Sequence, residues 1–331
     1  MSDVTIDAVF ELPVPIWVMT EVLDATYSSG YANLKFNVAM PTGEGSDGGP
    51  PAVIDLRGVE LSDPDMVWVH EYGAHIPQPY KPATALHRIV FTDVDGPTPA
   101  HLTWFTAEAQ LVEYVAPWFN AVRTWAEVVT GQDLDPNHRV YDAVEVGHGL
   151  TFLDRSHDGV HGLKLTTPRV LPVPARAWET ILENVRLGKE PPLEELLSRD
   201  ARASQRRGAE RRAVIEAATA LEIVLSRHLR GLISELPEPQ QRRLSRNPSL
   251  GTYIDIAEKS EMVLAVEYEK LRWLSLVRND ASHRGEAPGN WDAGTAVQIA
   301  IDFLGAHGRF RRTEEREPDG SEFVLVDPTD E

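Results

Sequence analysis

One apolar helical run of the chain ends in the stretch Val277-Arg278-Asn279-Asp280-Ala281-Ser282-His283-Arg284-Gly285. The run before it carries Tyr268, Leu271 and Leu274 at helical spacing, which predicts a helix with one buried face. Gly285 offers the left-handed conformation that commonly follows the last turn of a helix. We therefore expect an arginine, an amide and a histidine to cluster at the end of a core helix.

The spacing within this cluster favours a phosphate site. On an α-helix each residue advances by about 100°, so Asn279 and His283 would share one face, with Arg278 and Ser282 in the adjacent row. Arginine presents a fixed, charged fork to phosphate oxygens, histidine titrates near neutrality, and an amide can orient either. The alternative is that the arginine and the histidine only stabilise the negative end of the helix dipole.

Helical spacing extends over most of the second half of the chain. Helices are expected at 175–185, 193–202, 211–234, 252–284 (as two helices or one bent helix) and 293–307. Short connections between them predict a small all-α bundle of four to five helices. We assign 205–308 to this bundle, 166–204 to a helical connector and 309–331 to a charged tail.

The first half has the pattern of a β-rich domain. Leu34-Lys35-Phe36-Asn37-Val38 alternates apolar and polar residues, as a half-buried strand does. Similar runs separated by turn-rich segments occur at 52–56, 66–70, 86–91, 140–146, 151–153 and 163–165, and one amphipathic helix is expected at 117–129. Residues 1–165 therefore predict a sandwich or an open barrel, and the whole chain an α+β fold.

Composition narrows the functional classes. The chain has 331 residues, 42% hydrophobic and 25% charged, which is typical of a globular protein with about two domains. It has no cysteine, which excludes disulfides, thiolate zinc sites and a cysteine nucleophile. No apolar run is long enough to cross a membrane, and the start lacks the pattern of a signal peptide. We expect a cytoplasmic protein without a cofactor.

Charge is distributed unevenly along the chain. The net charge is −19, which argues against nonspecific coating of nucleic acid. Residues 1–165 hold 8 basic against 23 acidic side chains, whereas 199–246 hold 11 arginines against 6 acids. Within the second segment, a nucleic-acid backbone could follow Arg206, Arg207, Arg211 and Arg212. A solvated helix face is the alternative reading of this run.

The residues around the helix end resemble a known family. Arg278-Asn279, followed after three residues by His283-Arg284-Gly285 in a helical segment, resembles the HEPN superfamily (higher eukaryotes and prokaryotes nucleotide-binding). The most similar branch is the Apea-like one, in which a β-rich N-terminal domain precedes the helical domain. Ser249-Leu250-Gly251-Thr252-Tyr253-Ile254 and Ala220-Leu221-Glu222 are also similar to that branch. The resemblance covers about 205–307.

The resemblance implies a metal-independent endoribonuclease that acts as a homodimer through its helical bundle, in phage defence or as a toxin. The β-rich domain would then recognise a trigger ligand or protein. Many members of the superfamily lack nuclease activity. The alternative is therefore a catalytically silent scaffold that binds a nucleotide or dimerises.

The family motif also implies roles for individual residues. The catalytic pair would be Arg278 and His283, with Asn279 as a supporting polar residue and Ser282 and Arg284 beside them. A helix-borne acid would orient the arginine, and this sequence offers Glu222 and Glu216 for that role.

The chemistry of RNA cleavage supports a dimer independently. Attack by the 2′-hydroxyl requires a base, an acid and positive charge on the phosphoryl oxygens. One histidine and one arginine per chain are few for these tasks, and a two-fold dimer would supply two of each. No compact cluster of Asp and Glu near the motif suggests a two-metal site, so we expect a route without metal.

A second cluster offers a metal site as an alternative. Asp154-Arg155-Ser156-His157-Asp158-Gly159-Val160-His161 contains two histidines and two carboxylates, with His148 nearby. Asp and His beside Gly are also common in turns between strands. A metal hydrolase using the His157 region would lose its activity to a chelator.

Overall fold

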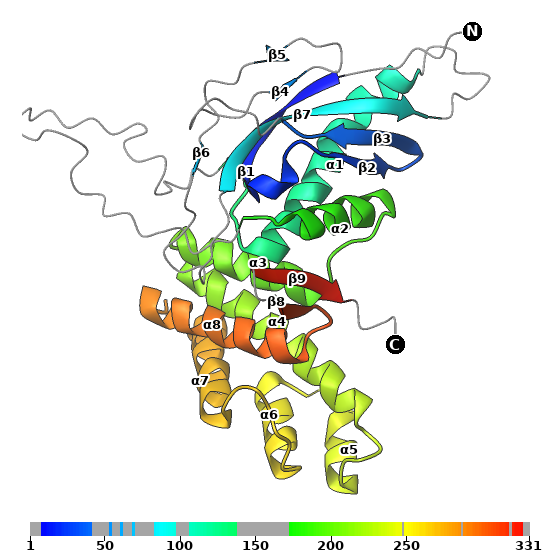
Figure 1. Cartoon of the computed structure of the whole chain (residues 1–331). Coiled ribbons are helices and arrows are strands. Elements are labelled where there is room, and N and C mark those ends of the chain that lie inside the picture. The colour runs from blue at the N-terminus through cyan, green and yellow to red at the C-terminus, as the bar shows by residue number, and fades with distance from the viewer. Residues whose placement is uncertain are drawn as a thin grey trace, which may run out of the picture. The chain divides into compact units, whose positions relative to one another are not determined.

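The chain divides into two compact units (Figure 1). The first comprises Met1–Glu190 with Glu314–Phe323, and the second comprises Pro191–Thr313 with Val324–Glu331. The first unit is built on a sheet and the second from helices, which confirms the expected α+β class. The computed structural model describes residues 8–41, 53–54, 60–61, 68–69, 83–96, 106–137, 172–246, 248–285, 287–317 and 320–326.

An antiparallel sheet in the form of a half-barrel organises the first unit. Its main strands, in order across the sheet, are β1 (Ala8–Met19), β7 (Ala83–Asp95), β3 (Leu34–Ala39) and β2 (Thr26–Tyr31). The short strand β6 (Trp68–Val69) also pairs with β7, and β4 (Val53–Ile54) pairs with β5 (Glu60–Leu61). Leu34, Phe36 and Val38 of β3 are buried, which confirms the strand predicted from their alternation.

Two helices complete the first unit, α1 (Ala107–Thr130) and α2 (Ala175–Arg186), beside a 3-10 turn at Thr20–Val22. Helix α1 packs on the sheet through Trp118, whose ring lies 5.1 Å from that of Phe91 and 5.7 Å from that of Phe36. The indole Nε1 donates a hydrogen bond to Ser29 Oγ at 3.0 Å. Trp118 and Trp125 therefore belong to the core of this unit, where both are almost fully buried.

The second unit is helical throughout the described part of residues 191–310. Its helices are α3 (Leu193–Arg206), α4 (Glu210–Gly231), α5 (Glu238–Leu244), α6 (Leu250–Lys259), α7 (Tyr268–Asn279) and α8 (Asn290–His307). The segment predicted at 252–284 is thus two helices. The stretch predicted as a charged tail contains two paired strands, β8 (Arg311–Glu317) and β9 (Gly320–Val326).

Helix α4 is the centre of the helical unit and packs against α3, α6, α7 and α8 (Figure 1). Its apolar stripe is fully buried, as its periodicity predicts, and includes Val214, Ala218, Leu221, Leu225 and Leu229. The close packing of α3 on α4 places α3 in the second unit, whereas α2 belongs to the first. The segment 166–204 is therefore divided between the two units.

Several sequence predictions lie outside the described residues. These are the strands expected at 140–146, 151–153 and 163–165, and the metal cluster with His148 and 154–161.

Candidate functional site

The candidate cluster begins where α7 changes its winding. After Asn279 the chain forms a π turn over Asp280–Arg284, and Gly285 follows in the left-handed conformation with φ of 71°. The glycine cap was predicted, but the α-helical rows were not correct, because a π turn bonds each residue to the fifth rather than the fourth along the chain. Asn279 and His283 therefore do not hold the regular i, i+4 relation of an α-helix.

The π turn changes the relation between Arg278 and His283. These two residues are five positions apart, and on an unbroken α-helix the fifth residue lies about 140° around the axis. In π winding the fifth residue returns close to the line of the first, because the hydrogen-bonded ring has one more residue. The turn thus rotates His283 toward the side of the helix that carries Arg278.

The side chains of the cluster differ in exposure. Arg278 and Ser282 are half-buried, whereas Asn279, His283 and Arg284 are exposed. Arg278 Nη1 donates to Asn279 Oδ1 at 3.3 Å, and its Nε is buried with no hydrogen-bond partner among the described residues. The arginine is thus held in place by burial while one of its donors awaits an acceptor.

Glu222 on α4 is the acidic residue whose charge interacts with Arg278. Burial raises the pKa of the Glu222 carboxyl above its ordinary value, and the arginine charge and a hydrogen bond with the Leu250 backbone oppose that rise. Leu250 is the first residue of α6, so the carboxylate lies at a helix N-terminus, where negative charge is favoured. Helices α4, α6 and α7 therefore meet at Glu222.

Glu216, the other acid that the sequence offered, has different partners. Its carboxylate accepts hydrogen bonds from Ser204 Oγ at 3.0 Å and from Arg212 Nε at 2.6 Å, and its side chain is 12% exposed. It therefore belongs to the contact between α3 and α4. Of the two acids, Glu222 is the one that reaches Arg278.

The basic run lies at the other end of α4. Arg206, Arg207, Arg211 and Arg212 are all exposed around the turn between α3 and α4. Arg211 and Glu222 are eleven positions apart on one helix, a distance of about 16 Å along the axis. The structure therefore does not bring this run together with the Arg278 cluster.

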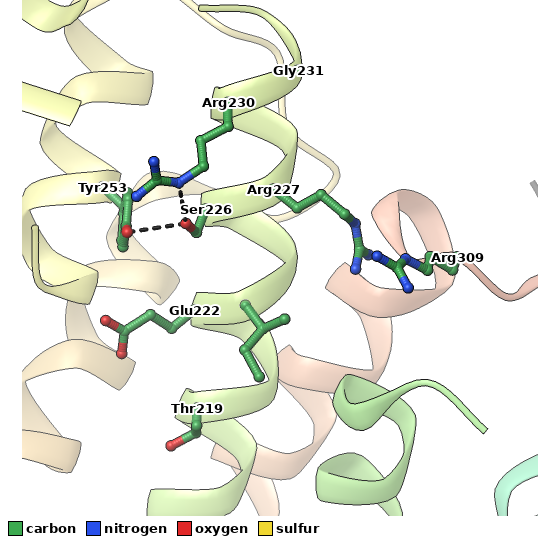
Figure 2. Close-up of a pocket in the computed structure, with 9 residues that line it drawn as sticks. Thr219, Glu222, Ser226, Arg227, Arg230, Gly231, Tyr253 and Arg309 are labelled. Atoms are coloured by element: carbon green, nitrogen blue, oxygen red, sulfur yellow. Dashed lines mark hydrogen bonds between the residues drawn. The ribbon is translucent and has the colours of Figure 1, made fainter. Parts of the chain in front are cut away.

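A surface groove of about 770 Å³ runs along α4 from the cluster toward the end of the helix (Figure 2). Its floor carries Thr219, Glu222, Ser226 and Arg230, with Tyr253 of α6 on one side and Arg309 on the other. The sequence analysis did not single out these residues as a group, apart from Glu222. The i, i+3 and i, i+4 spacing of polar residues opposite the buried stripe of α4 is the signal that could have identified the floor.

Comparison of the chain with protein-family models, with curated proteins and with solved structures found no match. Among the described residues, no helix combines the length and apolarity that crossing a bilayer requires. Within the same residues, no three side chains of His, Asp or Glu gather in a group that could hold a metal ion.

Proposed function

We propose that the helical unit is a metal-independent endoribonuclease in which Arg278 and His283 act on the scissile phosphate. The observation that carries the proposal is the setting of Arg278 at the end of α7. Its half-buried guanidinium faces Glu222 and has a buried donor without a partner among the described residues, and the π turn brings an exposed histidine toward the same side. The resemblance of this motif to the HEPN superfamily supports the same function.

The chemistry assigns a separate task to each side chain. His283, when neutral, accepts the proton of the RNA 2′-hydroxyl, and the 2′-oxygen attacks the adjacent phosphorus. Arg278 neutralises the non-bridging oxygens as their negative charge grows. The bond to the 5′-oxygen breaks and this oxygen takes a proton, which leaves a 2′,3′-cyclic phosphate and a 5′-hydroxyl. Glu222 holds the arginine in position, and Asn279 contacts its Nη1.

The acid that protonates the 5′-oxygen would come from a second copy of the chain. A two-fold dimer that places one π turn against the other supplies a second histidine and a second arginine. Large apolar side chains are exposed on both sides of the motif, with Leu276 64% and Trp291 85% exposed. An apolar surface of this kind next to a polar site favours burial against another chain.

A second candidate function is a catalytically silent scaffold that binds a nucleotide or dimerises. The exposure of His283 favours it, because no described side chain hydrogen-bonds the imidazole and fixes its orientation. A histidine that is oriented only in a dimer would reconcile this exposure with catalysis.

Cleavage of a mixed RNA pool in EDTA by the full chain tests the proposal. The parent should cut RNA, and an Arg278→Ala/His283→Ala double variant should lose at least about a thousandfold of the rate, the scale of removing both general-base and electrostatic contributions. Arg242→Ala is the matched control, because Arg242 is an exposed arginine on α5 that pairs only with its neighbour Glu238 among the described residues. Equal cleavage by the parent and the double variant would rule out the site.

The biological role that fits this activity is phage defence or toxin-like RNA cleavage in the cytoplasm, with the β-rich unit receiving a trigger. Expression of the parent should arrest growth, alone or during phage infection, and the double variant should not. Arrest by both chains at equal abundance would show that RNA cleavage at this site is not the cause.

A further inference from the structure

The groove on α4 has an excess of positive charge in a chain whose net charge is −19. Three arginines line it, Arg227 and Arg230 from α4 and Arg309 from the segment after α8 (Figure 2). The one acidic side chain that lines it is Glu222, whose carboxylate interacts with Arg278 outside the groove. A positive groove on an otherwise acidic protein concentrates anionic ligands.

One side of the groove holds two guanidinium groups against a single carboxylate. Arg227 Nη1 donates to Glu194 Oε1 at 2.5 Å, and Arg309 Nε lies 4.0 Å from the same oxygen. Glu194 is almost fully buried, with 3% of its side chain exposed. Arg227 Nη2 is buried and has no hydrogen-bond partner among the described residues. This side therefore carries one positive charge more than its carboxylate balances and offers a donor to an acceptor that enters the groove.

The other side holds Arg230 in a fixed position. Arg230 Nε donates to Ser226 Oγ at 3.3 Å, and the Ser226 hydroxyl donates to Tyr253 Oη at 3.0 Å. Tyr253 is 5% exposed and packs in the core of the helical unit, so it anchors the chain of hydrogen bonds. Figure 2 shows the guanidinium of Arg230 lying over Ser226 and Tyr253 at this edge. A guanidinium positioned in advance loses less entropy when it binds a phosphate.

The groove also leads to the site proposed for catalysis. Glu222 lines the groove and interacts with Arg278, so the two sites share this residue. From Glu222 to Arg230 the groove follows eight residues of α4, about 12 Å. A strand with one phosphate at Arg278 would continue along this floor, whereas a single phosphate could not occupy both ends.

We propose that the groove binds the phosphodiester backbone of the RNA strand next to the cleaved phosphate. Arg230 and Arg309 contact its phosphates from the two sides, and Arg227 completes the cradle from below. The identity of the ligand rests on the proposed function, whereas the anion site rests on the groove alone. Phosphate is the shared chemistry of an RNA strand and of a free nucleotide, and the length of the groove favours the strand.

Binding can be measured without cleavage, using the full-length His283→Ala chain and a fluorescent single-stranded RNA pool in EDTA. An Arg230→Gln/Arg309→Gln double substitution in this background should weaken binding about tenfold or more, on the scale of two charge-assisted hydrogen bonds. It should also reduce the slope of log K against log salt by about 1.4, because each phosphate contact on a single strand contributes about 0.7. Both residues are exposed, so their replacement should leave the melting temperature unchanged.

The outcomes separate this inference from the proposed function. An RNA affinity and salt slope equal to those of Arg242→Gln in the same background would overturn the groove, even if the parent cleaves RNA. Weakened RNA binding together with a parent that does not cleave would support the groove and remove the nuclease. An adenosine monophosphate probe is the second arm. If it binds with the same dependence on Arg230 while RNA does not bind, the groove is a nucleotide site and the RNA assignment is wrong.

Discussion

Glu222 and Arg278 form a charge pair between α4 and α7 in which burial outweighs attraction. The pKa of Glu222 stays above its ordinary value although the Arg278 charge lowers it. A pair of this kind contributes little to stability, because desolvation offsets the Coulomb attraction. Its value would then lie in holding the guanidinium of Arg278 at the end of α7.

Replacement Glu222→Gln should therefore reduce cleavage without reducing stability at neutral pH. The pKa of Glu222 is raised in the folded chain, so its favourable contribution is complete below its ordinary pKa of 4.5 and is lost as the pH rises. Glutamine does not titrate. The stability of the variant relative to the parent should increase between about pH 4 and pH 7, as measured by urea unfolding. Glu216→Gln is the control, and the pairing is wrong if it reproduces the effect on cleavage.

Acidification should destabilise the helical unit through His228. Burial lowers the pKa of this histidine on α4, whose ring lies 5.0 Å from that of His307. The unfolded chain binds the proton more tightly, so stability is complete above the ordinary pKa of 6.5 and is lost as the pH falls below it. His228→Gln should show a shallower loss of melting temperature between about pH 7 and pH 5. Identical slopes for parent and variant would contradict this assignment.

Gly285→Ala should destabilise the end of the π turn by about 1–2 kcal/mol, the cost of the left-handed conformation for an L-residue. A Cβ at this position would meet no atom within 4 Å, so the effect is conformational rather than steric. Gly285→Asn should recover part of the loss, since asparagine tolerates this conformation better. Equal unfolding free energies for the parent and the alanine variant would show that the turn relaxes without cost. Gly231→Ala is the matched control, because it is open in the same way and has no positive φ.

Trp291→Glu should shift the proposed dimer toward monomer. Trp291 begins α8 close to the motif and is 85% exposed, so burying it against a second copy would contribute substantially to association. Sedimentation velocity over a range of concentrations measures the change. Val263→Glu is a suitable control, because Val263 is 93% exposed on the loop before α7. A parent that sediments as a monomer at every concentration would remove the dimer from the mechanism.

The elements that the sequence predicted well are those with a regular apolar period. The stripe of α4 and the alternation in β3 each report one buried face, so local pattern and packing agree. Strand β1 has no such regularity. Its pairing with β7 shifts register between Glu11 and Ile16, where Pro13 and Pro15 interrupt the ladder, and proline in a strand suggests a loop when only the sequence is read.

Helix α1 illustrates a second kind of error. The prediction began at Pro117, because proline is common in the first turn of a helix. The helix instead starts after Thr106, whose side chain caps it, and Pro117 lies in its interior. Here the packing of Trp118 and the residues around it outweighs the local cost of the proline.

The candidate site could be located from the sequence but not built from it. The residue types at 278–285 identified the helix end, and Gly285 identified the cap. The choice between Glu222 and Glu216 required tertiary contacts, since both lie on α4. The groove could not be assembled from local pattern either, because Arg309 lies far from Arg230 along the chain and joins it only through the packing of α8 on α4.

The π turn amounts to one residue inserted into an α-helix. Deleting a single residue within 280–284 would restore regular α winding and turn everything that follows by about 100° relative to the helix before it. His283 would leave the side of Arg278, while the buried face formed by Leu271 and Leu274 would keep its packing. In evolution, a three-nucleotide deletion or insertion would therefore be enough to separate or reunite these two side chains without rebuilding the bundle.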